Sequence, residues 1–296
     1  MAFTIHLVVL CSAYLVASIA MRLLVLRSGL YLASAAVPFS MGAYVLAILS
    51  QPDPGLGLVG VALGIGVAAI AALLLGRLAG RVSIESLFAT SLLLQGLFYL
   101  AIYNLGSPGY AVGSIRNLTN GPGGLPVLDI GISGPGVALG TLGASLLAYL
   151  WMRALERSTA GTALEAVRSE PEMARTLGAE PERMRSDVVL TSHLMLAASG
   201  ALVAHQLGYV DPTLASIQAG LVLLALGLLS GVGGAMGPVV AVLLLIALPE
   251  SLRLVRVSDT LAGYARLAAA AVAVLGILLL QRVKTDRQRR LTSEKR

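Results

Sequence analysis

Residues 212–249 read PTLASIQAGLVLLALGLLSGVGGAMGPVVAVLLLIALP and contain no Asp, Glu, Lys or Arg. A helix needs about 20 mostly apolar residues to cross a bilayer, so this stretch can supply two crossings, divided by the glycines at 231–237. Further stretches without these charged residues lie at 1–21, 28–52, 54–76, 86–115, 130–152, 188–210 and 267–281. In lipid only helices and closed barrels pair all their backbone groups, and the alternation typical of barrel strands is absent. The pattern therefore predicts an all-α, polytopic membrane helix bundle.

The charge-free stretches place about nine transmembrane spans along the chain. We expect them near 3–24, 28–49, 56–77, 85–104, 134–154, 188–208, 214–231, 235–252 and 261–281. The composition agrees, because 57% of the residues are hydrophobic and 12% are charged, about half of the usual ~25% charged share. A soluble enzyme is therefore excluded. The net charge of +6 indicates membrane orientation rather than nucleic acid binding.

The basic residues predict the direction of the spans, since cytoplasmic loops carry an excess of Lys and Arg. With the basic tail 282–296 inside, nine spans place 17 of the 21 basic residues inside. The loop 155–187 then lies inside and the Gly- and Pro-rich loop 105–133 outside. A re-entrant hairpin within 214–252 would change this parity. We expect one transmembrane domain, 1–296, in a bacterial or archaeal inner membrane, with a cytoplasmic C-terminus.

Catalytic and metal-binding chemistry finds no support in the sequence. Cys11 is the single cysteine, so neither an internal disulfide nor a multi-cysteine metal site can form. His193 and His205 lie in one predicted span, and that span contains no Asp or Glu. No Ser/His/Asp set or carboxylate pair is visible. We expect no cofactor, no metal and no enzymatic activity.

The inner loop contains the most informative local pattern, TALEAVRSEPEMARTLGAEPERMRS at 162–186. Pro171 can open a short helix, because the first turn does not need its missing N–H. Gly178 suits the C-terminal cap. Met173, Ala174 and Leu177 can then share one face. The pattern is typical of a solvated connector, or of a docking helix whose small residues allow close approach of a partner.

Several segments resemble one transporter family. Glu172 to Gly178 (EMARTLG) resembles the E-x-A-x-x-x-G coupling motif of ABC-importer permeases. The segments 29–44 (GLYLASAAVPFSMGAY), 117–125 (NLTNGPGGL), 200–212 (GALVAHQLGYVDP) and 227–250 are similar, in order, to the LivM-like permease subunit of branched-chain amino acid importers. Together they cover about half of the chain.

The resemblance implies both function and partners. It implies ATPase coupling through Glu165, Arg168, Glu172, Ala174 and Gly178. It also implies two ABC ATPase subunits, a second related permease, an extracytoplasmic substrate-binding protein and a hydrophobic amino acid as the substrate. Urea and short amides are alternatives within the same class.

Broken helices predict the translocation pathway, since transporters line their cavities with interrupted spans. Pro38 lies inside the second predicted span and can kink it, and a second break falls at the glycine cluster. The expected pathway residues are Ser34, Pro38, Phe39, Ser40, Gly42, Gly231, Gly233, Gly234, Gly237 and Pro238. An ordinary kink and close helix packing are the alternatives for these two breaks. Ser34 and Ala35 replace the Gly-His pair of the family.

Two further expectations concern the external loop and the source of energy for transport. Asn120, Gly121, Gly123 and Gly124 form either a simple turn or part of a docking surface for the binding protein. An ion-coupled secondary transporter is the competing hypothesis, but such proteins carry intramembrane acids or paired polar groups. A membrane-embedded enzyme or a scaffold is a third possibility. The predicted spans contain almost no ionisable side chains, which favours the ATP-driven permease.

Overall fold

The computed structural model describes residues 2–51, 57–79, 81–107, 109–114, 116–128, 134–232 and 234–254. The helices are α1 (Ala2–Arg22), α2 (Ala36–Ser50), α3 (Gly57–Ala79), α4 (Ile84–Asn104), α5 (Gly134–Arg157), α6 (Thr159–Ser169), α7 (Pro171–Thr176), α8 (Pro181–Leu207), α9 (Ile217–Leu229), α10 (Gly237–Val242) and α11 (Leu248–Leu254). Short 3₁₀ or π turns are η1 (Leu23–Arg27), η2 (Ala33–Ala35), η4 (Gly121–Gly123), η5 (Pro212–Ala215), η6 (Gly234–Met236) and η7 (Leu243–Ala247). The strands β1 (Leu125–Pro126) and β2 (Tyr209–Val210) form one antiparallel pair, with Leu125 opposite Val210.

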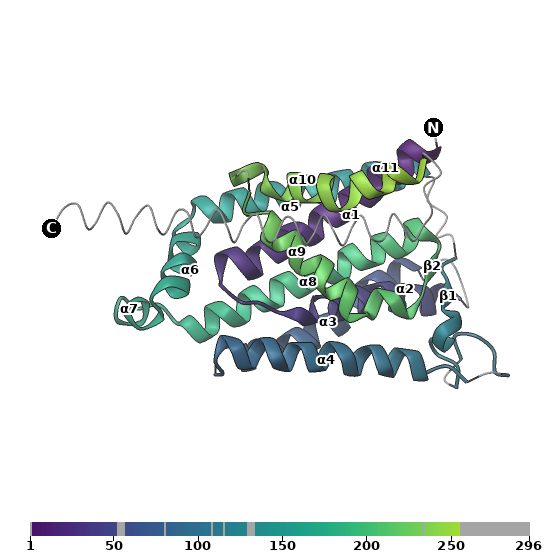
Figure 1. Ribbon diagram of the computed structural model, residues 1–296, viewed down its shortest axis with the longest axis horizontal. Helices are drawn as coiled ribbons and strands as arrows, with labels where there is room; N and C mark the ends of the chain where they lie inside the picture. Colours follow the sequence, from purple (N-terminus) through teal and green to yellow (C-terminus); the bar gives the residue numbers. More distant parts are fainter. Residues whose placement is uncertain are drawn as a thin grey trace.

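The prediction of an all-α membrane bundle is confirmed (Figure 1). Within the described residues, seven helical segments are long and apolar enough to cross a membrane: Phe3–Arg27, Ala33–Ser50, Val59–Ala79, Ile84–Asn104, Gly134–Arg157, Pro181–Leu207 and Gly234–Ser251. They match seven of the nine expected spans. The expected span 261–281 lies outside the described residues.

The prediction of a full span at 214–231 was wrong in its length. Helix α9 has 13 residues, which rise only ~20 Å, and the turn η5 precedes it. The chain nevertheless passes the whole bundle here, because η5 follows β2 at one end and Ser230 reaches Arg22 at the other. The segment α10–α11 then returns along α1 until Glu250 lies 3.7 Å from His6. A re-entrant hairpin is therefore excluded.

The centre of the bundle is held by α8, which packs against α1, α2 and α3. Glycines allow α2 and α8 to touch backbone to backbone. A Cβ added at Gly200 would lie 1.8 Å from the carbonyl oxygen of Phe39, and one added at Gly42 would lie 2.0 Å from that of Ala197. Small residues that permit such close approach are typical of membrane helix interfaces.

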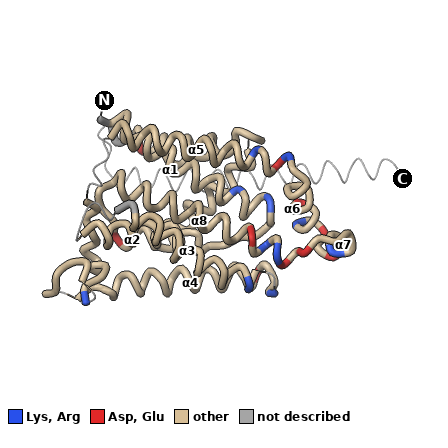
Figure 2. Tube along the Cα trace, turned by 180° about the vertical axis from the view of Figure 1, so that it is seen from behind, with Lys and Arg blue, Asp and Glu red and all other residues tan. Residues whose placement is uncertain are grey.

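Charge and exposed apolar side chains divide the surface of the bundle. Lys, Arg, Asp and Glu gather at the end that carries α6 and α7, which we call the charged end (Figure 2). The β1–β2 pair lies at the opposite end (Figure 1). Between the two ends, α3, α4 and α5 expose large apolar side chains, among them Ile70, Leu74, Leu93, Leu97, Leu139 and Leu147. Such a surface suits lipid rather than water.

Candidate functional site

Helix α2 begins deep inside the bundle rather than at its end. After η1 the chain leaves helical geometry at Gly29, whose φ is +72°. The backbone N–H of Ala33 then donates a 2.9 Å hydrogen bond to the Ser91 hydroxyl, which lies well within α4. Regular α-helix starts only at Ala36.

The kink expected at Pro38 is absent, because α2 starts only at Ala36. Pro38 is the third residue of α2, where a backbone N–H has no helical partner in any case. The break in the second span therefore precedes the proline, and Pro38 belongs to the start of the new helix.

Helix α9 begins next to this break. Ser216 caps it, with its hydroxyl oxygen accepting a 3.2 Å hydrogen bond from the N–H of Ala219. The buried Gln95 side chain of α4 donates to the carbonyl oxygen of Ala215 just ahead of the cap. A Cβ added at Gly220 would lie 2.4 Å from the carbonyl oxygen of Ala33. Two interrupted spans thus meet inside the bundle, and α4 holds both.

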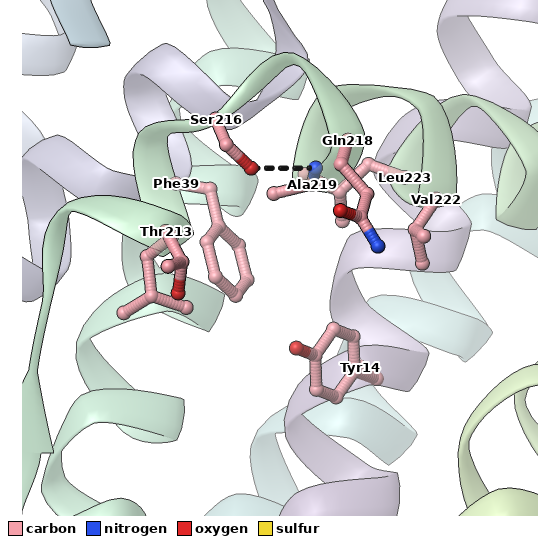
Figure 3. Close-up of a pocket in the computed structure, with 9 residues that line it drawn as sticks. Tyr14, Phe39, Thr213, Ser216, Gln218, Ala219, Val222 and Leu223 are labelled. Carbon is pink, nitrogen blue, oxygen red and sulfur yellow. Dashed lines mark hydrogen bonds between the residues drawn. The ribbon is translucent and has the colours of Figure 1, made fainter. Parts of the chain in front are cut away.

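A cavity of about 220 Å³ opens beside the start of α9 (Figure 3). It is smaller than the ~300–1,000 Å³ that drug-sized ligands occupy, which suits a small molecule. Figure 3 shows the Gln218 amide group pointing across this space toward Tyr14, with Phe39 on another wall. The rings of Tyr14 and Phe39 stack with centroids 5.8 Å apart. The lining residues are Tyr14, Phe39, Thr213, Leu214, Ser216, Gln218, Ala219, Val222 and Leu223.

Of the predicted pathway residues in α2 and η2, Phe39 lines the cavity. Ser34 is fully buried, and its hydroxyl has no partner within the described residues. Ser40 donates to the carbonyl oxygen of Val37 in its own helix, 3.2 Å away. Gly42 serves the contact with α8 described above. Sequence reasoning missed Tyr14 and the segment 213–223.

The glycine cluster lies between two helices rather than breaking one, contrary to expectation. Gly231 and Gly234 lie between α9 and α10 at the charged end (Figure 1), and Gly237 and Pro238 are the first two residues of α10. A Cβ added at Gly237 would lie 1.8 Å from the carbonyl oxygen of Ser230, so this turn needs a glycine. Gly233 lies outside the described residues.

The helix expected at 171–178 is present as α7 at the tip of the charged end (Figure 2). Pro171 opens it, and Gly178 follows it with a φ of +89°. The N–H groups of Gly178 and Ala179 donate to the carbonyl oxygens of Arg175 and Ala174, both at 3.0 Å. This is the hydrogen-bond pattern of a Schellman cap.

Of the three residues predicted to share one face of α7, only Ala174 departs from the prediction. Ala174 is buried at 3% exposure, whereas Met173 is 66% and Leu177 is 80% exposed. The surface that α7 offers is therefore a pair of apolar side chains rather than a stripe of small ones. Glu172 is exposed beside them and lies 3.8 Å from Arg175.

Glu165 and Arg168 of α6 contact the end of the first span instead of standing free. The Glu165 carboxylate lies 3.4 Å from the Arg27 guanidinium. Arg168 donates to the carbonyl oxygen of Leu26, and its Cγ lies 3.1 Å from the Cβ position of Gly29. Helix α6 is thereby joined to the segment that leads into the broken second span.

A buried ion cluster lies beneath α6. The Glu156 side chain, only 6% exposed, lies 2.9 Å from Arg22, 2.8 Å from Arg27 and 3.3 Å from Arg153. Glu156 was not predicted as a site residue. A carboxylate so close to the end of a predicted span is the signal that could have found it, because buried charges there need partners.

The turn at 120–124 is ordered by side-chain contacts with the rest of its loop and with β2. Asn120 adopts a φ of +57°, and its side-chain amide donates a 2.9 Å hydrogen bond to the carbonyl oxygen of Gly124. Tyr209 of β2 donates to the carbonyl oxygen of Gly123. Gly121 is buried beneath the turn. The turn thus forms one unit with the β1–β2 pair.

Comparison with known proteins gives one match that spans almost the whole chain. Residues 3–283 match the protein family described as the permease component of branched-chain amino acid transport systems. No curated protein and no solved structure matches the chain.

Proposed function

Because the chain belongs to the family of ABC-transporter permease components for branched-chain amino acids, we propose that it is one of two membrane subunits of an ATP-driven importer. It is a multi-pass membrane protein and a transport component rather than an enzyme. Two separate ATPases act on it from the cytoplasm, and an extracytoplasmic binding protein delivers a hydrophobic amino acid. The charged end faces the cytoplasm, in keeping with the excess of basic residues there.

The cavity beside α9 is the observation that carries this proposal. Thr213 and Gln218 are exposed on the same face, next to the apolar Ile217 and Leu221 at 44% and 47% exposure. Polar side chains directed into hydrocarbon are costly, so lipid does not suit this face. A second permease subunit covers it, and the substrate passes between the two.

The lining of the cavity favours an amino acid with an apolar side chain. Phe39, Val222 and Leu223 supply an apolar wall, while Gln218 and Thr213 supply hydrogen-bonding groups beside it. Binding sites for small molecules combine apolar walls with a few placed polar groups in this way. Urea lacks an apolar part that such a wall would recognise.

ATP hydrolysis by the partner subunits acts on the permease through α7. No Gly-Lys-Ser/Thr phosphate loop follows the glycine cluster at 227–237, so ATP hydrolysis belongs to other subunits. Met173 and Leu177 project from the charged end within a segment rich in Glu and Arg. An apolar pair surrounded by charge is a compact anchor for a groove on a partner protein.

Replacing Met173 and Leu177 together by Asp tests the docking role. We expect the ATPase subunits to stop co-purifying with the permease, because two charges replace its apolar anchor. The permease itself should keep its thermal stability, since both side chains are exposed and surface substitutions usually change stability by less than about 0.5 kcal/mol.

Val82→Asp is the matched control for this test. Val82 is also an exposed apolar residue, at 37%, and it lies just ahead of α4. This variant should retain the ATPases. Retention of the ATPases by the double Asp variant would refute the assignment of α7 as their docking helix.

A further inference from the structure

Glu156 joins the end of α5 to the end of the first span, which is distant in the sequence. It lies at the end of α5, and its Oε1 accepts hydrogen bonds from Arg22 at 2.9 Å and from Arg27 at 3.2 Å. Arg27 also reaches Glu165 on α6. One buried carboxylate therefore ties α5 to the end of the first span and, through Arg27, to the helix that precedes α7.

The same cluster holds the far end of α9. Arg22 donates through a second nitrogen to the carbonyl oxygen of Ser230, the residue that caps the C-terminus of α9. A guanidinium at this position satisfies an unpaired carbonyl and complements the negative end of the helix dipole. Helix α9 is a single 13-residue element whose other end lines the cavity. The cluster is thus joined to one wall of the cavity through a single helix.

A second connection runs from α6 to the opposite wall. Arg168 donates to the carbonyl oxygen of Leu26 and packs on Gly29. From there the non-helical stretch passes through η2 into α2, which carries Phe39 into the cavity. Both walls of the cavity are therefore linked to α6.

Space for movement exists beside α6. A groove of about 260 Å³ that is open to the surface lies between α5, α6 and α8, and Trp151, Leu164, Met184 and Asp187 are among its lining residues. Protein interiors are otherwise packed densely, and a shift of a packed element requires room. The groove lies beside α6 and away from the contact between α2 and α8.

We propose that Glu156 is the positioning residue that transmits the movement of α6 and α7 to the cavity walls. Its carboxylate keeps Arg22 on the end of α9 and Arg27 within reach of Glu165. When ATPases shift α6, the cluster moves as a unit and α9 moves with it. The inference rests on the proposed function, since it takes the ATPases as the source of the motion.

A single cysteine in the cavity reports this motion directly. Gln218→Cys is introduced with Cys11→Ser, and the permease is assembled with its partner permease and ATPases. The labelling rate by a water-soluble maleimide is measured with and without ATP. We expect ATP to change the rate by about fivefold or more, the scale of typical coupling between sites. In Glu156→Gln the change should vanish while ATP hydrolysis continues.

Two further variants keep the test decisive. Glu165→Gln with Arg168→Gln cuts both links at exposed positions of α6, so its effect does not depend on a folded buried variant. It should abolish the ATP-dependent change as Glu156→Gln does. Glu180→Gln removes an exposed carboxylate paired locally with Arg183 at 3.7 Å and should leave the change intact.

The outcomes separate the inference from the proposed function. Full ATP dependence in Glu156→Gln, or in the α6 double variant if Glu156→Gln does not fold, overturns the role of the cluster. If the parent assembly itself binds no ATPases or shows no response to ATP, the proposed function fails instead. Parallel loss of ATP hydrolysis and labelling change in Glu156→Gln would mark Glu156 as merely structural and also overturn the inference.

Discussion

Gly200 and Gly42 show how strongly single residues control the position of the cavity wall. Each stands where the backbones of α2 and α8 touch, so neither position has room for a side chain. Phe39, which lines the cavity, belongs to this contact through its own carbonyl oxygen. The position of Phe39 thus depends on the absence of a side chain at Gly200 of α8.

Gly200→Ala should therefore destabilise the bundle by ~1–3 kcal/mol, the usual cost of overpacking. Thermal unfolding in detergent measures this effect. Gly143→Ala on α5 is the control, because a Cβ added there meets no atom within 4 Å and Ala favours helix by up to about 1 kcal/mol. Equal stability of the two variants would contradict the close contact.

At the scale of elements, hydrophobic length predicted where the chain crosses but not where each helix starts. A proline ten residues into an apolar run looks the same whether it kinks a helix or begins one. The choice depends on Ser91 and Gln95 of α4, which hold the non-helical segments ahead of α2 and α9. Such contacts between distant segments leave no periodic pattern. By contrast, the caps of α7 are local, and Pro171 and Gly178 predicted them correctly.

Pro38→Ala tests the position of the break. Pro38 lies in the first turn of α2. The free energy of unfolding of the variant should therefore lie within about 0.5 kcal/mol of that of the parent. Ala43→Pro, in the middle of the same helix, should cost ~3 kcal/mol or more. Thermal unfolding measures both variants. A large loss of stability on removing Pro38 would indicate that the proline itself forms the kink.

At the scale of the whole molecule, the sites lie where residues far apart in the chain meet. Arg22 and Glu156 are separated by 134 positions, so their pairing could not be predicted from spacing. Gln95 and Gln218 gave a weaker signal, since amides are uncommon within charge-free spans. The spans and the charged end were predictable because they follow from composition and length alone, whereas the positions of the helix breaks were not, since neither Pro38 nor the glycine cluster marks them.

The orientation of the whole molecule is open to labelling in intact cells. With Cys11→Ser as background, a cysteine at Tyr110 should react with a membrane-impermeant maleimide, and one at Glu180 should react only after the membrane is opened. Both positions are exposed, so accessibility differs only through the membrane. Reaction of the Glu180 cysteine from outside would reverse the role of every loop.

We propose that separate ATPases drive this permease through α7. Leucine uptake into proteoliposomes that contain both permeases, the ATPases and the binding protein tests it most directly. We expect uptake that requires ATP, that stops when Met173 and Leu177 are replaced by Asp, and that survives Val82→Asp. Uptake driven by a proton or sodium gradient without ATP would contradict it.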